Sequence, residues 1–113
     1  MSTYTPDVWV VLEFTAPQLD EPMRKVFAGW YGGFAGSNTW KLNSGITVTR
    51  RVEDWFEFDG YSGSTYHCHA NNYHLSSLMQ GVLARWQKQG KDQEVEIRIL
   101  TLDEVSEMTY NID

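Results

Sequence analysis

The sequence is poor in cysteine and in long apolar segments. Cys68 is the only cysteine, so no disulfide can form within the chain. The longest apolar run near the N-terminus, residues 8–12, is far too short to cross a bilayer, and no basic segment precedes it as in a secretory leader. We therefore expect the protein to work in a reducing cytoplasm.

Basic residues are also scarce. Nine Lys and Arg residues stand against fifteen Asp and Glu residues, which gives a formal net charge of −6. Direct binding of nucleic acid and docking on an anionic membrane are disfavoured, because both need clustered cations. A host protein or protein complex with a basic surface is compatible with this charge.

Aromatic residues, in contrast, are plentiful. Five Trp, six Tyr and five Phe residues supply large apolar surfaces to a chain of 113 residues. That length is enough for one hydrophobic core, so residues 1–113 are expected to form a single domain.

The apolar pattern predicts an α+β fold, with an antiparallel β-sheet of about five to six strands and one amphipathic helix packed on one face. Residues 7–14 carry apolar side chains on both faces of a strand, which is typical of a strand covered on both sides. Turn-forming residues separate the other extended segments. These segments are residues 23–31, 39–43, 46–52, 55–59, 64–69 and 94–100.

The helix is predicted over residues 75–86. Its apolar positions fall at helical spacing and form one stripe. They are Leu75, Leu78, Met79, Val82, Leu83 and Trp86. Gly90 stands where a residue just beyond the C-terminus is expected, and Gly81, which is costly inside a helix, suggests close approach to the sheet. Leu102, Val105 and Met108 have the spacing of a short helical turn.

All three histidines lie close to the single cysteine. His67 and His69 alternate on one predicted strand, and His74 follows five residues later. Such a pair can present two imidazoles to a divalent transition metal, with His74 as a third ligand. The alternative is that His67 and His69 stand on the solvated face of a sheet while Tyr66 and Cys68 enter the core.

Two glycine-rich turns carry aromatic residues. The first, residues 29–37, contains Trp30, Tyr31 and Phe34, and it lacks the phosphate-loop patterns. The second, residues 60–64, contains Tyr61 and lacks the spacing of a hydrolase nucleophile elbow. The aromatics could form a binding rim or a nucleotide-binding loop, or they could fill the core while the glycines turn its corners.

Acidic residues are concentrated in two stretches. One contains Glu53, Asp54, Glu57 and Asp59, and the other covers the C-terminal part from residue 92 onward. Spaced carboxylates could form a face for a basic partner, or they could be an ordinary solvated surface.

Residues 40–46 (WKLNSGI) and 61–66 (YSGSTY) resemble segments of short uncharacterised proteins encoded by phages and prophages. The resemblance implies a class of small inhibitors that bind a host complex, such as anti-CRISPR or anti-restriction proteins. With no complete catalytic constellation, the leading hypothesis is a non-enzymatic interaction protein without a cofactor. Its predicted partner-binding residues are Glu53, Asp54, Glu57, Asp59, Tyr61, Trp30, Tyr31 and Phe34.

The alternative hypothesis is a metal-, small-ligand- or nucleotide-binding protein that uses His67, His69 and His74 or the glycine-aromatic loops. Exposed sheet edges would permit a homodimer without requiring one.

Overall fold

The computed structural model describes residues 2–33 and 36–109 of the chain. Its strands are β1 (Thr3–Tyr4), β2 (Val8–Thr15), β3 (Met23–Trp30), β4 (Thr39–Leu42), β5 (Ile46–Val52), β6 (Trp55–Gly60), β7 (Thr65–His69) and β8 (Glu96–Ile99). Its helices are the 3₁₀ turn η1 (Ala70–Asn72), α1 (Ser77–Lys91) and α2 (Leu102–Glu107). No helix in these residues is both long enough and apolar enough to span a membrane.

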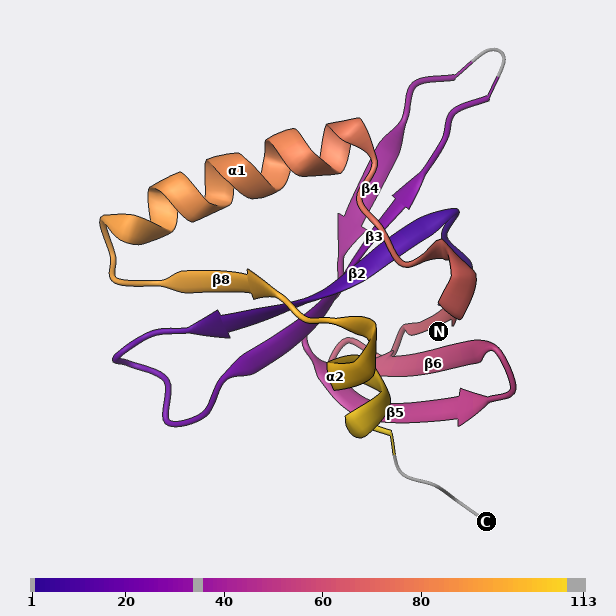
Figure 1. Ribbon diagram of the computed structural model, residues 1–113, viewed down its shortest axis with the longest axis horizontal. Helices are drawn as coiled ribbons and strands as arrows, with labels where there is room; N and C mark the ends of the chain where they lie inside the picture. Colours follow the sequence, from indigo (N-terminus) through magenta and orange to yellow (C-terminus); the bar gives the residue numbers. More distant parts are fainter. Residues whose placement is uncertain (1, 34–35, 110–113) are drawn as a thin grey trace.

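The strands form two sheets rather than one (Figure 1). One sheet has the order β4-β3-β2-β8, and the other has the order β1-β7-β6-β5. All neighbouring strands are antiparallel except β1 and β7. The α+β class is confirmed, but the single sheet of five to six strands is wrong, because eight strands are divided between two stacked sheets.

The sheet β4-β3-β2-β8 is the middle layer of the molecule. Strand β2 shows why, since alternate side chains enter two different cores. Val8, Val10 and Leu12 pack with α1, whereas Trp9 and Val11 pack with the second sheet. The prediction that residues 7–14 form a strand covered on both faces is therefore confirmed.

Trp9 joins the two sheets. Its side chain is fully buried, and its ring lies against Phe56, Phe58 and Tyr73. The indole N–H donates a hydrogen bond of 2.7 Å to the carbonyl oxygen of His69. This bond satisfies a polar atom that would otherwise be costly to bury.

Helix α1 begins two residues later and ends five residues later than the sequence predicts. Ser76 is the N-cap, because its hydroxyl accepts a hydrogen bond from the Met79 amide. Met79, Val82 and Leu83 are buried as expected. Leu78, however, is 37% exposed, so the buried stripe is narrower than the sequence suggests.

Neither glycine of α1 has its predicted role. Gly81 is exposed, and a methyl group added there would meet nothing within 4 Å. Gly90 lies inside the last turn and is buried, and its added methyl carbon would lie 2.7 Å from the carbonyl oxygen of Val95. Close approach thus occurs at Gly90, where the chain reverses toward β8, and not at Gly81.

The predicted helical turn near Leu102 is confirmed as α2. Thr101 and Glu104 form a capping box at its start. Val105 is fully buried in the core between the sheets, and Leu102 and Met108 pack against that core. Helix α2 therefore covers one end of the space between the two sheets.

Candidate functional site

One face of the second sheet is covered by no other element in the described chain. We call it the open sheet face. Its residues alternate along β6 and β7 with residues that point into the core, which are Phe56, Phe58, Tyr66 and Cys68. The registers of β5, β6 and β7 place on it Val48, Arg50, Val52, Trp55, Glu57, Asp59, Thr65, His67 and His69. The sequence-predicted alternation of β7, with Tyr66 and Cys68 inward, is therefore confirmed.

A salt-bridge network neutralises part of the predicted acidic surface. Arg50 donates to both carboxylate oxygens of Asp59 at 2.8 Å and to Glu57 at 3.3 Å. Thr65 donates a further hydrogen bond of 2.9 Å to Asp59. The Arg50 guanidinium, more than any other group, holds the pKa of Asp59 below its usual value. Two of the four predicted acidic partner residues thus already have a cationic partner within the sheet.

The other predicted residues of this region lie at the two ends of β6. Glu53 and Asp54 form the exposed turn before β6, and Glu53 has a positive φ of 56°. Tyr61 follows the other end of the strand and is 74% exposed. One side of the Tyr61 ring approaches Gly45, which has no side chain to obstruct it. Glu53 and Tyr61 therefore flank the open sheet face.

The predicted metal ligands are in aromatic and backbone contacts. The His67 ring stacks on the Trp55 ring with 4.2 Å between ring centres, and the His69 ring lies nearly perpendicular to the same ring with 4.8 Å between centres. Nδ1 of His69 accepts a hydrogen bond of 3.0 Å from the Asn71 amide. A neutral imidazole that accepts at Nδ1 carries its proton on Nε2, so His69 would have to lose this bond to bind a metal.

His74 is exposed and lies apart from this pair, in the segment between η1 and α1. Within residues 2–33 and 36–109, no three His, Cys, Asp or Glu side chains lie close enough together to hold one metal ion. The metal site stays a prediction that needs a rearrangement of the histidine strand.

Trp30 and Tyr31, in the first glycine-aromatic loop, are held by contacts with the N-terminal segment. Trp30 is half-buried against Tyr4, and its indole N–H donates to the carbonyl oxygen of Thr5 at 3.1 Å. Tyr31 is 51% exposed, while its amide donates to Asp7. Phe34 lies outside the described residues. Tyr31 is thus a predicted contact residue with a free side chain, whereas Trp30 has a structural role.

The sequence did not reveal an apolar groove on the other side of the molecule. It lies on the helix-covered face of the middle sheet, beyond the area that α1 covers. It consists of two adjoining hollows of about 360 and 380 Å³ that share Phe14, Leu42 and Val95. The remaining lining residues are Ala16, Gln18, Leu19, Met23, Lys25, Trp86, Gln89, Gly90, Gln93 and Ile97. We call this set the apolar groove.

The groove arises because the helix and the sheet differ in how far their apolar surfaces extend. The apolar stripe of α1 ends at Trp86, and polar residues fill most of the last turn. On the sheet, the same face continues past Leu12 to Phe14 and its cross-strand partners Met23 and Ile97. Side chains at this end of the sheet therefore stay partly open, and Met23 is 36% exposed.

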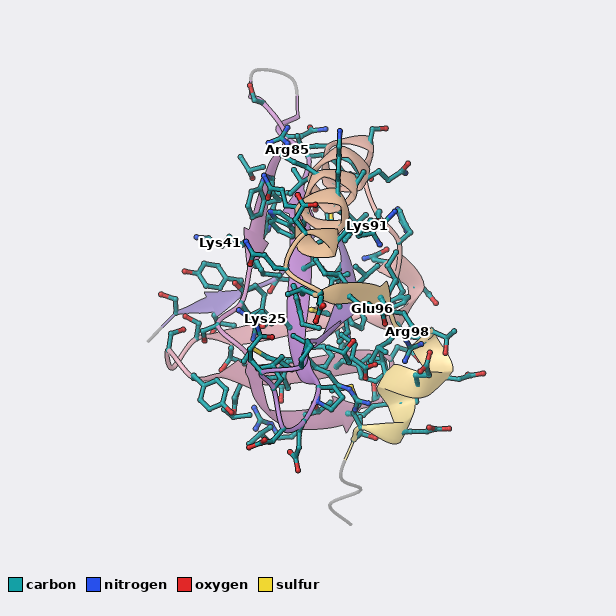
Figure 2. All side chains as sticks on the ribbon, turned by 90° about the vertical axis from the view of Figure 1, so that its left-hand side faces the viewer. Lys25, Lys41, Arg85, Lys91, Glu96 and Arg98 are labelled. Atoms are coloured by element: carbon teal, nitrogen blue, oxygen red, sulfur yellow. The ribbon has the colours of Figure 1, made fainter. Side chains whose placement is uncertain are left out.

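Lys25 is the only charged residue that lines the groove. Its ammonium lies 5.8 Å from the centre of the Phe14 ring, at the distance of a cation–π contact. Figure 2 labels Lys25 beside the strands, below the end-on helix that carries Arg85 and Lys91. The sequence did contain a signal for this site, because Phe14, Met23 and Lys25 alternate along their strands in step with the core residues that face α1. The groove could not be predicted from this signal, because the sequence did not locate the end of α1 accurately.

No protein-family model, curated protein or solved structure matches this chain in the comparisons made.

Proposed function

We propose that this chain is a non-enzymatic protein-binding module whose docking surface is the apolar groove. The observation that supports it best is the continuous, partly exposed apolar lining formed by Phe14, Met23, Leu42 and Trp86. Apolar surface of this kind, bordered by polar residues, is typical of interaction sites on soluble domains. Aromatic anchors such as Trp86 are common among residues that dominate binding energy.

The lining chemistry favours binding over catalysis. A catalytic site needs an acid, base or nucleophile with a second group that activates it. The groove offers one lysine, three glutamines and otherwise apolar side chains and glycine. It is also open along its length, which suits a segment of another protein better than a small molecule that must be enclosed.

Within this class, an inhibitor of a host complex is the role we favour. The support is the resemblance of residues 40–46 and 61–66 to short phage proteins. Leu42, one of the residues shared by both hollows, belongs to the first of these segments. An inhibitor that works by occupying a partner surface requires a docking site and no catalytic group.

Site-specific photo-crosslinking tests the proposed surface. A photoreactive phenylalanine analogue at Met23, on the groove, is compared with the same analogue at Val52, which is 58% exposed on the open sheet face. We expect a discrete crosslinked species in producing cells from position 23 and none from position 52. Addition of Lys25→Glu to the position 23 variant should weaken the crosslink.

The two positions distinguish the two candidate surfaces. A crosslink from position 52 alone would transfer the docking role to the open sheet face and its acidic ends, as the sequence predicts. The absence of crosslinks from both positions, with the folded protein present at normal levels, would contradict an interaction role for either surface.

A further inference from the structure

We infer that the apolar groove receives an acidic protein segment that carries apolar anchor side chains. This inference rests on the proposed function and names the chemistry of the partner. Its basis is that Lys25 is the only charged side chain lining the groove and that the adjoining helix α1 has no acidic residue, in a chain whose net charge is −6.

Helix α1 forms one wall of the groove, and all of its charged residues are basic. Its fifteen residues include Arg85, Lys88 and Lys91 and no Asp or Glu. Lys25 adds a fourth cation on the sheet beneath it. Of these cations, only Lys25 lines the groove itself, so a carboxylate-bearing ligand there meets the Lys25 ammonium, while the helix cations favour its approach at longer range.

Lys25 and the cations of α1 form no salt bridge with a carboxylate of the described residues, unlike most arginines elsewhere in the chain. Arg24, Arg50 and Arg98 form salt bridges with carboxylates. Arg51 donates to the backbone of Glu53 and lies over the Phe56 ring. Among the described residues, Arg85 and the four lysines form no salt bridge with a carboxylate; the lysines are Lys25, Lys41, Lys88 and Lys91.

Acidic residues follow the end of α1 but do not line the groove itself. Asp92 and Glu94 follow the helix directly, and Glu96 begins β8, but none of them lines either hollow. Glu94 and Glu96 line a neighbouring hollow together with Lys91, and this hollow shares Ala16 and Val95 with the groove. Lys25 remains the only charged side chain that lines the groove itself.

Binding of defined peptides to the purified chain tests the inference. The probe is a fluorescein-labelled twelve-residue peptide with Leu and Phe anchors separated by Glu, and its matched control has Lys at every Glu position. We expect the acidic peptide to bind measurably in fluorescence anisotropy and the basic peptide to bind at least about tenfold more weakly. In NMR spectra, the indole N–H of Trp86 should shift, whereas that of Trp9, which is hydrogen-bonded in the core, should not.

Two charge-reversal variants locate the effect. Lys25→Glu changes the groove, while Lys41→Glu makes the same change on the opposite face of β4, where Lys41 lies 5.1 Å from the Tyr4 ring. We expect Lys25→Glu to weaken the acidic peptide roughly tenfold and Lys41→Glu to weaken it less than about twofold. Equal effects of the two variants would mean that only long-range charge is involved, and would overturn the inference.

Other outcomes overturn it in ways that identify the true occupant. Equal binding of both peptides would remove the charge preference. Displacement of the peptide by dodecanoate at comparable affinity would assign the groove to an anionic amphiphile. A dimer in sedimentation that Lys25→Glu abolishes would assign it to a second copy. If the crosslink from position 23 persists in cells while the acidic peptide fails to bind, the proposed function stands and only this inference fails.

Discussion

Alanine substitutions at Gly81 and Gly90 should change the stability of the protein in opposite directions, although both glycines belong to α1. At Gly81 the added methyl group points into open space. Replacement of glycine by alanine inside an exposed helix should then stabilise the fold by about 1 kcal/mol, mainly by reducing the conformational freedom of the unfolded chain. For a domain of this size, that corresponds to a rise in Tm of about 4 °C.

At Gly90 the same gain is outweighed by a steric clash. The new methyl carbon would lie 2.7 Å from the carbonyl oxygen of Val95, whereas ordinary contacts begin near 3.4 Å. The Val95 amide also donates a 2.8 Å hydrogen bond to the Gly90 carbonyl, so neither segment can withdraw without cost. We expect Gly90→Ala to destabilise the fold by about 1–3 kcal/mol net, the usual cost of overpacking.

Urea unfolding followed by far-UV circular dichroism measures both effects. We expect the urea midpoint to rise for Gly81→Ala and to fall for Gly90→Ala, while the dependence of the unfolding free energy on urea concentration stays the same. Each variant serves as the control for the other, because the chemical change and the helix are the same. The reasoning is refuted if both variants shift the midpoint in the same direction, or if Gly81→Ala is the more damaging change.

Three further predictions concern groups whose environment the structure defines. Burial raises the pKa of the Cys68 thiol, so the native protein should react with a disulfide reagent at pH 8 far more slowly than the urea-unfolded chain; equal rates would contradict the burial. Arg98 and the Thr101 amide lower the pKa of Glu104 from 4.5 to about 2, so this residue stabilises the fold above pH 4.5 and its contribution is lost as the pH falls toward 2. Glu104→Gln should therefore flatten acid unfolding in that range, and an unchanged pH profile would argue against the capping contact. Asn43→Ala should destabilise the fold by about 1–2 kcal/mol in urea unfolding, because it leaves the buried Val26 amide without the 2.8 Å hydrogen bond to Asn43; an unchanged midpoint would mean that another group satisfies the amide.

Much of the secondary structure could be predicted from the sequence because its strands and helices have strong local patterns. The pairs β5–β6 and β6–β7 are joined by short turns and share registers that alternation alone suggests. The division into two sheets could not be predicted, because it depends on which strands pair over long distances. The pairing of β1 with β7, which joins Thr3 to Thr65, has no local signal in the sequence.

The candidate site shows a similar limit. The alternation of β7 correctly placed His67 and His69 on an outer face, but it could not show that the Trp55 ring contacts both imidazoles. Runs of acidic residues indicated a charged surface, but only cross-strand register reveals that Arg50 reaches Asp59. The apolar groove was missed for a different reason, since it depends on where α1 ends relative to the strands beneath it.

The inferred acidic partner has to be reconciled with a chain that is itself acidic. The groove and the open sheet face lie on opposite sides of the middle sheet, and stacked sheets alone are separated by about 10 Å. At physiological ionic strength the screening length is about 8 Å, so a ligand in the groove experiences Lys25 more strongly than the carboxylates across the molecule. At about 0.01 M salt the screening length grows to about 30 Å, and repulsion from the net charge of −6 reaches the ligand as well. Affinity for an acidic segment should therefore pass through a maximum as salt is raised, whereas a purely attractive surface would show a continuous decline.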